Sequence, residues 1–365
     1  MKRQTLVIAG LALLSTNAFA SKARVEALGQ DGVRGSEFIS DSRNVFRNPA
    51  VLNDTKNYLV TEWGTAATTD TAAAPRAEGG FFREAGSFAY GLYLGNSNGR
   101  DDANRSGAAE YLNQTNAMDL FFAGDMGVKW GAKLHYASSK DQQTGAFERK
   151  NTAFGLGLGA VMGSAEAYLD LDLSDKSNGA AAASDEWKLK PSFLVGGSYA
   201  WEGTTFFANY ESSKYEVKTA TTATTKDSTI TVGAGRIMEI NPTARVFTDA
   251  KVVLDTTEVA AGKTKSQTLP VTLGMEAEAT SWLTLRGSVA QNVILNNNKN
   301  AAGKKSTTNN TTNVNAGATL NFGKLKVDGV IGTTGGNRGT GTTSQEQGVL
   351  ATDNLLTRVG VTYMF

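Results

Sequence analysis

Charged side chains at alternate positions are the residues of this sequence most able to do chemistry. Lys129 and Lys133, for example, alternate with Trp130 and Leu134. The charges that share the polar face of such runs are Lys129, Lys133, Lys188, Lys190, Arg245, Lys251, Arg286, Lys326 and Arg358 against Glu166, Asp170, Asp172, Glu211, Asp249, Glu276, Glu278 and Asp328. Because the two signs nearly cancel, a wall lined by these groups is expected to select only weakly between cations and anions.

The spacing of these charges is compatible with two roles, ion pairing within the wall and selection of solutes by charge. Glu166, Asp170 and Asp172 lie on one run, and Lys188 and Lys190 lie on the next. Opposite charges on neighbouring strands form ion pairs that stiffen a sheet. The same charges could instead form a constriction that sorts solutes by charge. Ion pairing is the simpler interpretation, and both can hold for the same residues.

The sequence offers no residues for catalysis or cofactor binding. His135 is the single histidine and shares the parity of Lys129 and Lys133, which favours a solvated or ion-paired ring over a catalytic one. There is no cysteine, hence no thiol metal site. Lys and Arg (36) balance Asp and Glu (35), so no basic excess points to nucleic acid. We therefore expect no enzymatic activity, no metal and no cofactor.

Alternation with a period of two predicts the elements that carry these charges, and it is clear in the final run Leu355 to Phe365. Further runs are predicted at 88–95, 120–123, 128–137, 152–161, 165–173, 187–201, 204–215, 228–240, 244–254, 267–279, 283–295, 312–322 and 325–333. These make fourteen strands. A hairpin of Tyr58 to Trp63 and Gly79 to Glu84 would make sixteen, which we prefer.

Turn and loop lengths favour a barrel over a soluble β-sandwich. Short turns such as Glu202-Gly203 alternate with long polar segments, predicted at 138–147, 174–186, 216–227, 258–266, 296–310 and 333–354. This segregation is typical of membrane barrels, as are tryptophans near strand ends, here Trp130, Trp187, Trp201 and Trp282. The sequence thus predicts an all-β, transmembrane, antiparallel up-and-down β-barrel of about 16 strands, with 14 as the alternative.

The first residues predict export. Lys2 and Arg3 precede an apolar run of nine residues, and Ala20 completes a small-residue cleavage site, so residues 1–20 read as a signal peptide. Residues 21–56 are predicted to form a periplasmic or luminal, plug-like segment, and 57–365 the barrel. Export without an apolar helix long enough to span a bilayer favours the outer membrane.

Several stretches resemble known families. The sequence Asp41-Ser42-Arg43-Asn44-Val45-Phe46-Arg47-Asn48-Pro49-Ala50, followed by a strand, resembles the Asn-Pro-Ala segment of the long-chain fatty-acid transporter barrels. That resemblance implies an N-terminal segment within the barrel and transport of hydrophobic compounds. The stretches 47–64 and 78–96 resemble major outer-membrane proteins of predatory bacteria, and the terminal aromatic Phe365 resembles that of outer-membrane porins, where it serves assembly.

These observations predict a porin-like channel for passive diffusion of small hydrophilic solutes with weak charge selectivity. The alternatives are a closed barrel for structure or surface display and a hydrophobic-compound transporter of the fatty-acid transporter type. Expected partners are outer-membrane lipid and lipopolysaccharide, the barrel-assembly machinery and small solutes. Association into homo-oligomers is compatible with the sequence.

Overall fold

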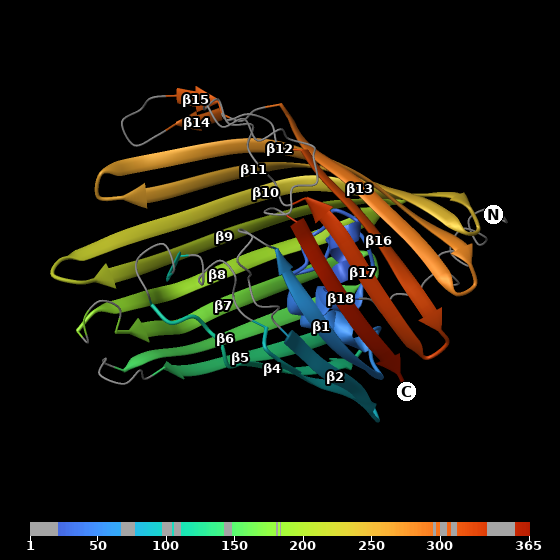
Figure 1. Ribbon diagram of the computed structural model, residues 1–365, viewed down its shortest axis with the longest axis horizontal. Coiled ribbons are helices and arrows are strands. Elements are labelled where there is room, and N and C mark those ends of the chain that lie inside the picture. Colours follow the sequence, from blue (N-terminus) through green and yellow to red (C-terminus); the bar gives the residue numbers. More distant parts are fainter. Residues whose placement is uncertain are drawn as a thin grey trace.

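The alternating runs form strands that pair in sequence order, each antiparallel to its neighbours (Figure 1). The computed structural model describes residues 21–66, 77–96, 104–105, 111–141, 148–179, 182, 184–294, 297–299, 305–307, 312–333 and 355–365. The first strand pairs with the last, with Leu59 opposite Tyr363, and this pairing closes the barrel. Within this part of the chain, no helix is both long and apolar enough to cross a membrane.

The strands are β1 Tyr58–Ala66, β2 Ala77–Ala85, β3 Phe88–Leu94, β4 Ala117–Asp125, β5 Lys129–Asp141, β6 Arg149–Met162, β7 Ala165–Asn178, β8 Glu186–Trp201, β9 Thr204–Lys218, β10 Thr222–Asn241, β11 Ala244–Val259, β12 Gly262–Thr280, β13 Leu283–Ile294, β14 Asn297–Lys299, β15 Lys305–Thr307, β16 Thr312–Phe322, β17 Leu325–Thr333 and β18 Leu355–Met364. The short hairpin β14–β15 lies outside the wall, because β13 pairs directly with β16. The wall therefore has the sixteen strands predicted, and β1 and β2 belong to it.

Alternate residues point out of the barrel, and most are apolar. On β6 the outward Phe154 and Leu158 are more than two-fifths exposed, whereas the inward Ala153 is buried. Tyr210 on β9, Ile230 on β10 and similar side chains continue this apolar band. The inward face carries glycine, polar and charged residues, so the wall has the two chemically distinct surfaces that the alternation predicts.

Strand lengths are unequal around the barrel. β5 to β12 have 13 to 20 residues, whereas β1 to β4 have 7 to 9. Two of the predicted long loops, 216–227 and 258–266, are mostly strand: β9 and β10 are joined across 219–221, and β11 and β12 across 260–261. The threonine-rich composition that indicated loops also suits strands, because β-branched residues favour the extended backbone. The predicted loop 333–354 lies, beyond Thr333, outside the described residues.

An irregularity in β8 changes which of its residues point into the barrel, contrary to the prediction for this strand. The register between β8 and β9 shifts between Lys190 and Phe193, around Pro191, which has no N–H for the ladder. As a result Trp187 is inside and fully buried, whereas Phe193 is outside and 36% exposed. Trp187 therefore does not belong to an interfacial girdle. Lys188 and Lys190 point outward, so their prediction as lumen-lining charges was wrong.

The N-terminal segment lies inside the barrel near the end that carries the C-terminus (Figure 1). It contains α2 Lys22–Ala27, η2 Ser42–Phe46 and η3 Pro49–Asn53. Both η2 and η3 are 3₁₀ helices. Asp41 caps η2 by accepting from the N–H of Arg43, and Asn48 caps η3 by accepting from the N–H of Ala50. The Asn-Pro-Ala motif is thus a helix start, with proline at the first position.

Candidate functional site

Inward-facing glycines let the N-terminal segment approach the wall closely. A Cβ atom added to Gly131 on β5 would lie 2.2 Å from the carbonyl carbon of Pro49 in η3. Cβ atoms at Gly317 on β16 and Gly360 on β18 would similarly collide with α2 at Ala27 and with Ser21. Since Cβ atoms essentially never make contacts below 3.0 Å, these positions require glycine while the segment is in place. Residues 21–56 are called the plug from here on.

Ion pairs join the plug to the wall on several sides. The plug cation is named first in each of these pairs: Lys22 with Glu78 (2.5 Å), Arg24 with Glu276 (3.1 Å), Arg34 with Glu211 (2.8 Å), Arg43 with Glu62 (3.3 Å) and Arg47 with Glu166 (3.2 Å). Other pairs have the opposite polarity, such as Glu26 with Arg358 at 2.7 Å. The partners lie on β1, β2, β7, β9, β12 and β18. The plug is therefore held electrostatically around much of the barrel's circumference.

Glu276 is the centre of the densest of these contacts. Its carboxylate accepts from Arg24 of the plug and from Arg245 and Arg286 of the wall. Arg24 also pairs with the plug's own Asp41 at 2.7 Å, and Arg286 also pairs with Asp328 at 3.3 Å. A buried carboxylate among three guanidinium groups is well compensated, since each hydrogen bond is charge-assisted.

Burial shifts the ionisation of two plug side chains. It lowers the pKa of Lys22 to about 8, helped by the nearby charge of Arg43 and opposed by Glu78 and Glu62. It raises the pKa of Glu26 to about 7 although Arg358 and Lys22 stabilise the carboxylate. In both cases the loss of water around the charged form outweighs the partners. The α2 end of the plug is therefore sensitive to pH near neutrality.

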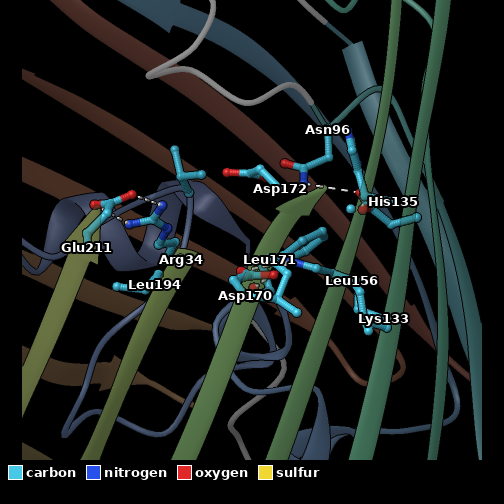
Figure 2. A pocket seen from close by; sticks show the side chains of 14 residues that line it. Arg34, Asn96, Lys133, His135, Leu156, Asp170, Leu171, Asp172, Leu194 and Glu211 are labelled. Atoms are coloured by element: carbon cyan, nitrogen blue, oxygen red, sulfur yellow. Dashed lines mark hydrogen bonds and ion pairs between the residues drawn. The ribbon is translucent and has the colours of Figure 1, made fainter. Parts of the chain in front are cut away.

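A cavity of about 70 Å³ lies between the plug and strands β4 to β9. Figure 2 shows side chains that line it. Lys133 on its floor pairs with Asp170 at 2.9 Å and donates to the carbonyl oxygen of Phe46. His135 contacts Asp119 through Nδ1 at 2.9 Å and Gln114 through Nε2 at 3.0 Å. Both ring nitrogens of His135 therefore have a partner in the described part of the chain.

Arg34 and Glu211, which form an ion pair, line both this cavity and a second one of about 190 Å³. The second cavity lies between the plug and strands β7 to β11, and both Asp249 and Lys251 line it. Gln30 of the plug donates to Asp249 across part of this space. A third cavity, of about 250 Å³, lies beside Glu276 and is lined by charged and hydroxyl side chains. The space around the plug is thus polar.

The structure brings most of the predicted lumen-lining residues to the plug or to one another. The plug is contacted by Glu166, Glu211, Glu276 and Arg358, and by Lys129 through Asp54. Lys133 pairs with Asp170, and Glu276 is contacted by Arg245 and Arg286, with Asp328 and Lys326 beside them. The cavities are lined by Asp172, Asp249, Lys251 and Glu278. Lys188 and Lys190 do not join them. Phe365 ends the last strand with its N–H donating to Asn57, and Ala20 lies outside the described residues.

Sequence reasoning missed the plug side of these contacts. Arg24, Arg34, Arg43 and Arg47 are spread over 24 residues with no alternation to mark them. Their one signal is that a segment predicted to be mostly polar turns carries several long cations. Trp187 was assigned to the wrong face, and it packs inside against Tyr111 and Tyr215.

Comparisons with known proteins find similarity in the fold. No protein family model and no curated protein matches the sequence. Among solved structures, a Pseudomonas aeruginosa FadL homologue is 12% identical, with 93% of this chain and 98% of that chain covered and a TM-score of 0.44. The Ralstonia pickettii toluene transporter TbuX is 11% identical (96% and 99% covered, TM-score 0.40), and a Rh. blastica porin mutant is 11% identical (85% and 98% covered, TM-score 0.33). The chain thus resembles both outer-membrane porins and FadL-type barrels.

Proposed function

We propose that this protein is an outer-membrane channel for passive diffusion of small hydrophilic solutes, with the plug narrowing its lumen. The outward apolar band supports placement in a membrane, because a barrel strand needs roughly 9–11 residues to cross one, and the strands from β5 to β13 exceed that length. A closed wall leaves no strand edge unpaired in lipid.

The observation that carries the proposal is the polar lining of the space beside the plug. The second cavity is bordered by Asn209, Thr229 and Thr231 together with the charges of Asp249 and Lys251. Groups of this kind replace the water around a hydrophilic solute, whereas a hydrophobic compound would leave them unpaired. Both signs of charge border the same space, which favours weak charge selectivity.

A closed barrel is the second candidate, and the plug-to-wall ion pairs described above favour it, because they oppose any movement of the plug. The two functions differ in whether water and solute cross the protein. Single-channel recording in planar bilayers decides between them, with liposome swelling in sugar solutions as a second measurement.

The Arg34→Ala variant makes this recording specific to the plug. Because Arg34 lines both of the first two cavities, we expect removal of its side chain to enlarge the space between them. We expect conductance events from the unmodified protein and a larger unit conductance from the variant. Lys56→Ala is the control, because it removes an exposed ion pair with Glu84 and Lys56 lines neither of these two cavities. Silent bilayers with all three proteins would favour the closed barrel.

A further inference from the structure

The outward face of β7 to β10 carries a cluster of lysines beyond the apolar band. This lysine belt consists of Lys176, Lys188, Lys190, Lys214, Lys218 and Lys226. Their outward direction follows from the register, in which each lies opposite another outward residue while the buried Trp187, Leu189 and Ser213 take the inward positions. The belt lies at the ends of these strands opposite the turns at 163–164, 202–203 and 242–243.

Three strand pairings in the belt place lysine directly opposite lysine. Lys176 faces Lys188, and Lys214 lies between Lys190 on one side and Lys226 on the other. Like charges opposite one another destabilise a sheet. Such pairings are tolerable where an anion lies between the ammonium groups.

Glutamates of the same face neutralise the belt only in part. Glu186 pairs with Lys176 at 2.6 Å and Glu216 with Lys190 at 2.8 Å, while Lys226 shares Glu258 with Lys263. On β7 to β10 the belt thus has six lysines for two glutamates. A net positive surface remains on a part of the wall where every strand is longer than a bilayer crossing requires.

The apolar side chains next to the belt indicate which kind of anion would bind there. Phe193 on β8, Tyr210 on β9 and Ile230 on β10 are outward, apolar and more than a third exposed, and each lies within four residues of a belt lysine. A ligand with acyl chains against these residues would place a headgroup at the level of the ammonium groups, about 10 Å further along the strands. Lysine binds phosphate as a point charge.

We propose that the lysine belt binds the phosphorylated headgroup of a glycolipid in the outer leaflet of the outer membrane. The inference rests on the proposed function for the outer membrane, and it takes the belt ends of the long strands to be extracellular. It assigns a fixed position on the wall, over β7 to β10, to a lipid that other faces of the barrel hold less tightly. The two lysine pairs around Lys214 would each share a phosphate oxygen.

The test measures binding of bisphosphorylated lipid A to the purified protein in detergent micelles, with dephosphorylated lipid A as the comparison. Lys188→Gln combined with Lys214→Gln removes belt charge without breaking any ion pair described above. We expect binding about thirtyfold weaker, from a loss of about fivefold per lysine near an anionic lipid surface. Arg236→Gln combined with Lys324→Gln, at the short-turn end, is the matched control and should bind as the unmodified protein does.

Equal binding of the two lipids, or equal loss in both double variants, would overturn the proposal. Displacement of lipid A by inorganic phosphate at the same concentration would also overturn it, because the belt would then be a site for free phosphate. Conductance recorded from the same preparations separates the two proposals. Conductance without a preference for phosphorylated lipid would refute only the proposal on the lysine belt. A preference for phosphorylated lipid without conductance would refute only the proposed channel.

Discussion

The contact between the plug and the wall can be tested most directly at Glu276. In Glu276→Gln the amide keeps the shape of the side chain but loses the charge that three arginines share. Breaking one partner of a buried ion pair costs roughly 3–5 kcal/mol. Arg24 keeps Asp41 and Arg286 keeps Asp328, so we expect the lower end of this range, about 3 kcal/mol.

This loss corresponds to roughly a hundredfold in the ratio of folded to unfolded protein. It is measured as the free energy of unfolding in guanidinium chloride, in detergent micelles, from tryptophan fluorescence. Glu278→Gln is the control, because Glu278 lies one inward position along the same strand and is exposed. A similar, small effect of both substitutions would refute the role of the cluster.

A double-mutant cycle with Arg24→Met separates the plug from the wall. If Glu276 holds the plug, the double variant should lose less than the sum of the two single variants, because Arg24 and Glu276 are direct partners at 3.1 Å. Strict additivity would mean that Glu276 stabilises only the wall arginines. The reasoning on plug anchoring would then fail even if Glu276→Gln were destabilising.

Three further predictions concern the plug, the orientation and the last residue. Because burial raises the pKa of Glu26 from 4.5 to about 7, its contribution to stability is complete below pH 4.5 and is lost as the pH rises through 7. In Glu26→Gln the free energy of unfolding should therefore change less with pH between 4.5 and 7, and an unchanged pH profile would contradict this. In whole cells, a membrane-impermeant maleimide should label Thr221→Cys but not Thr243→Cys, and the reverse result would invert the topology. Phe365→Ala should lower the heat-resistant folded fraction in membranes more than Phe322→Ala does, whereas equal yields would count against a role in assembly.

The sequence predicts the wall well because a period of two is a local property. Lys133 and Asp170 were placed on the inward face from alternation alone, and they form an ion pair there. The same rule fails at Lys188, because the irregularity at Pro191 changes which alternate residues point inward, although polar and apolar residues still alternate in the sequence. Nothing in a single strand marks where the register shifts, so faces beyond a bulge are the part of a barrel that alternation predicts least well.

The plug contacts could not be predicted for a different reason. Arg24 and Glu276 are 252 residues apart, and neither position carries a spacing that points to the other. The near-balance of luminal charge was counted on the strands alone, yet Glu166, Glu211 and Glu276 each face a plug arginine. Pairing between distant residues depends on the closed barrel, which a linear pattern does not encode.

The beginning of the plug lies across the seam where the first and last strands meet. Ser21 donates to Asp328 on β17, the N–H of Lys22 donates to Glu62 on β1, and Glu26 pairs with Arg358 on β18. Two of these contacts join residues 307 and 332 positions apart. The plug, which precedes every strand of the wall, can therefore be seated only after the final strand has paired, because its binding site does not exist before then. Docking of this segment therefore marks the completion of assembly. It also stabilises the pairing of β1 with β18, whose loss would open the barrel.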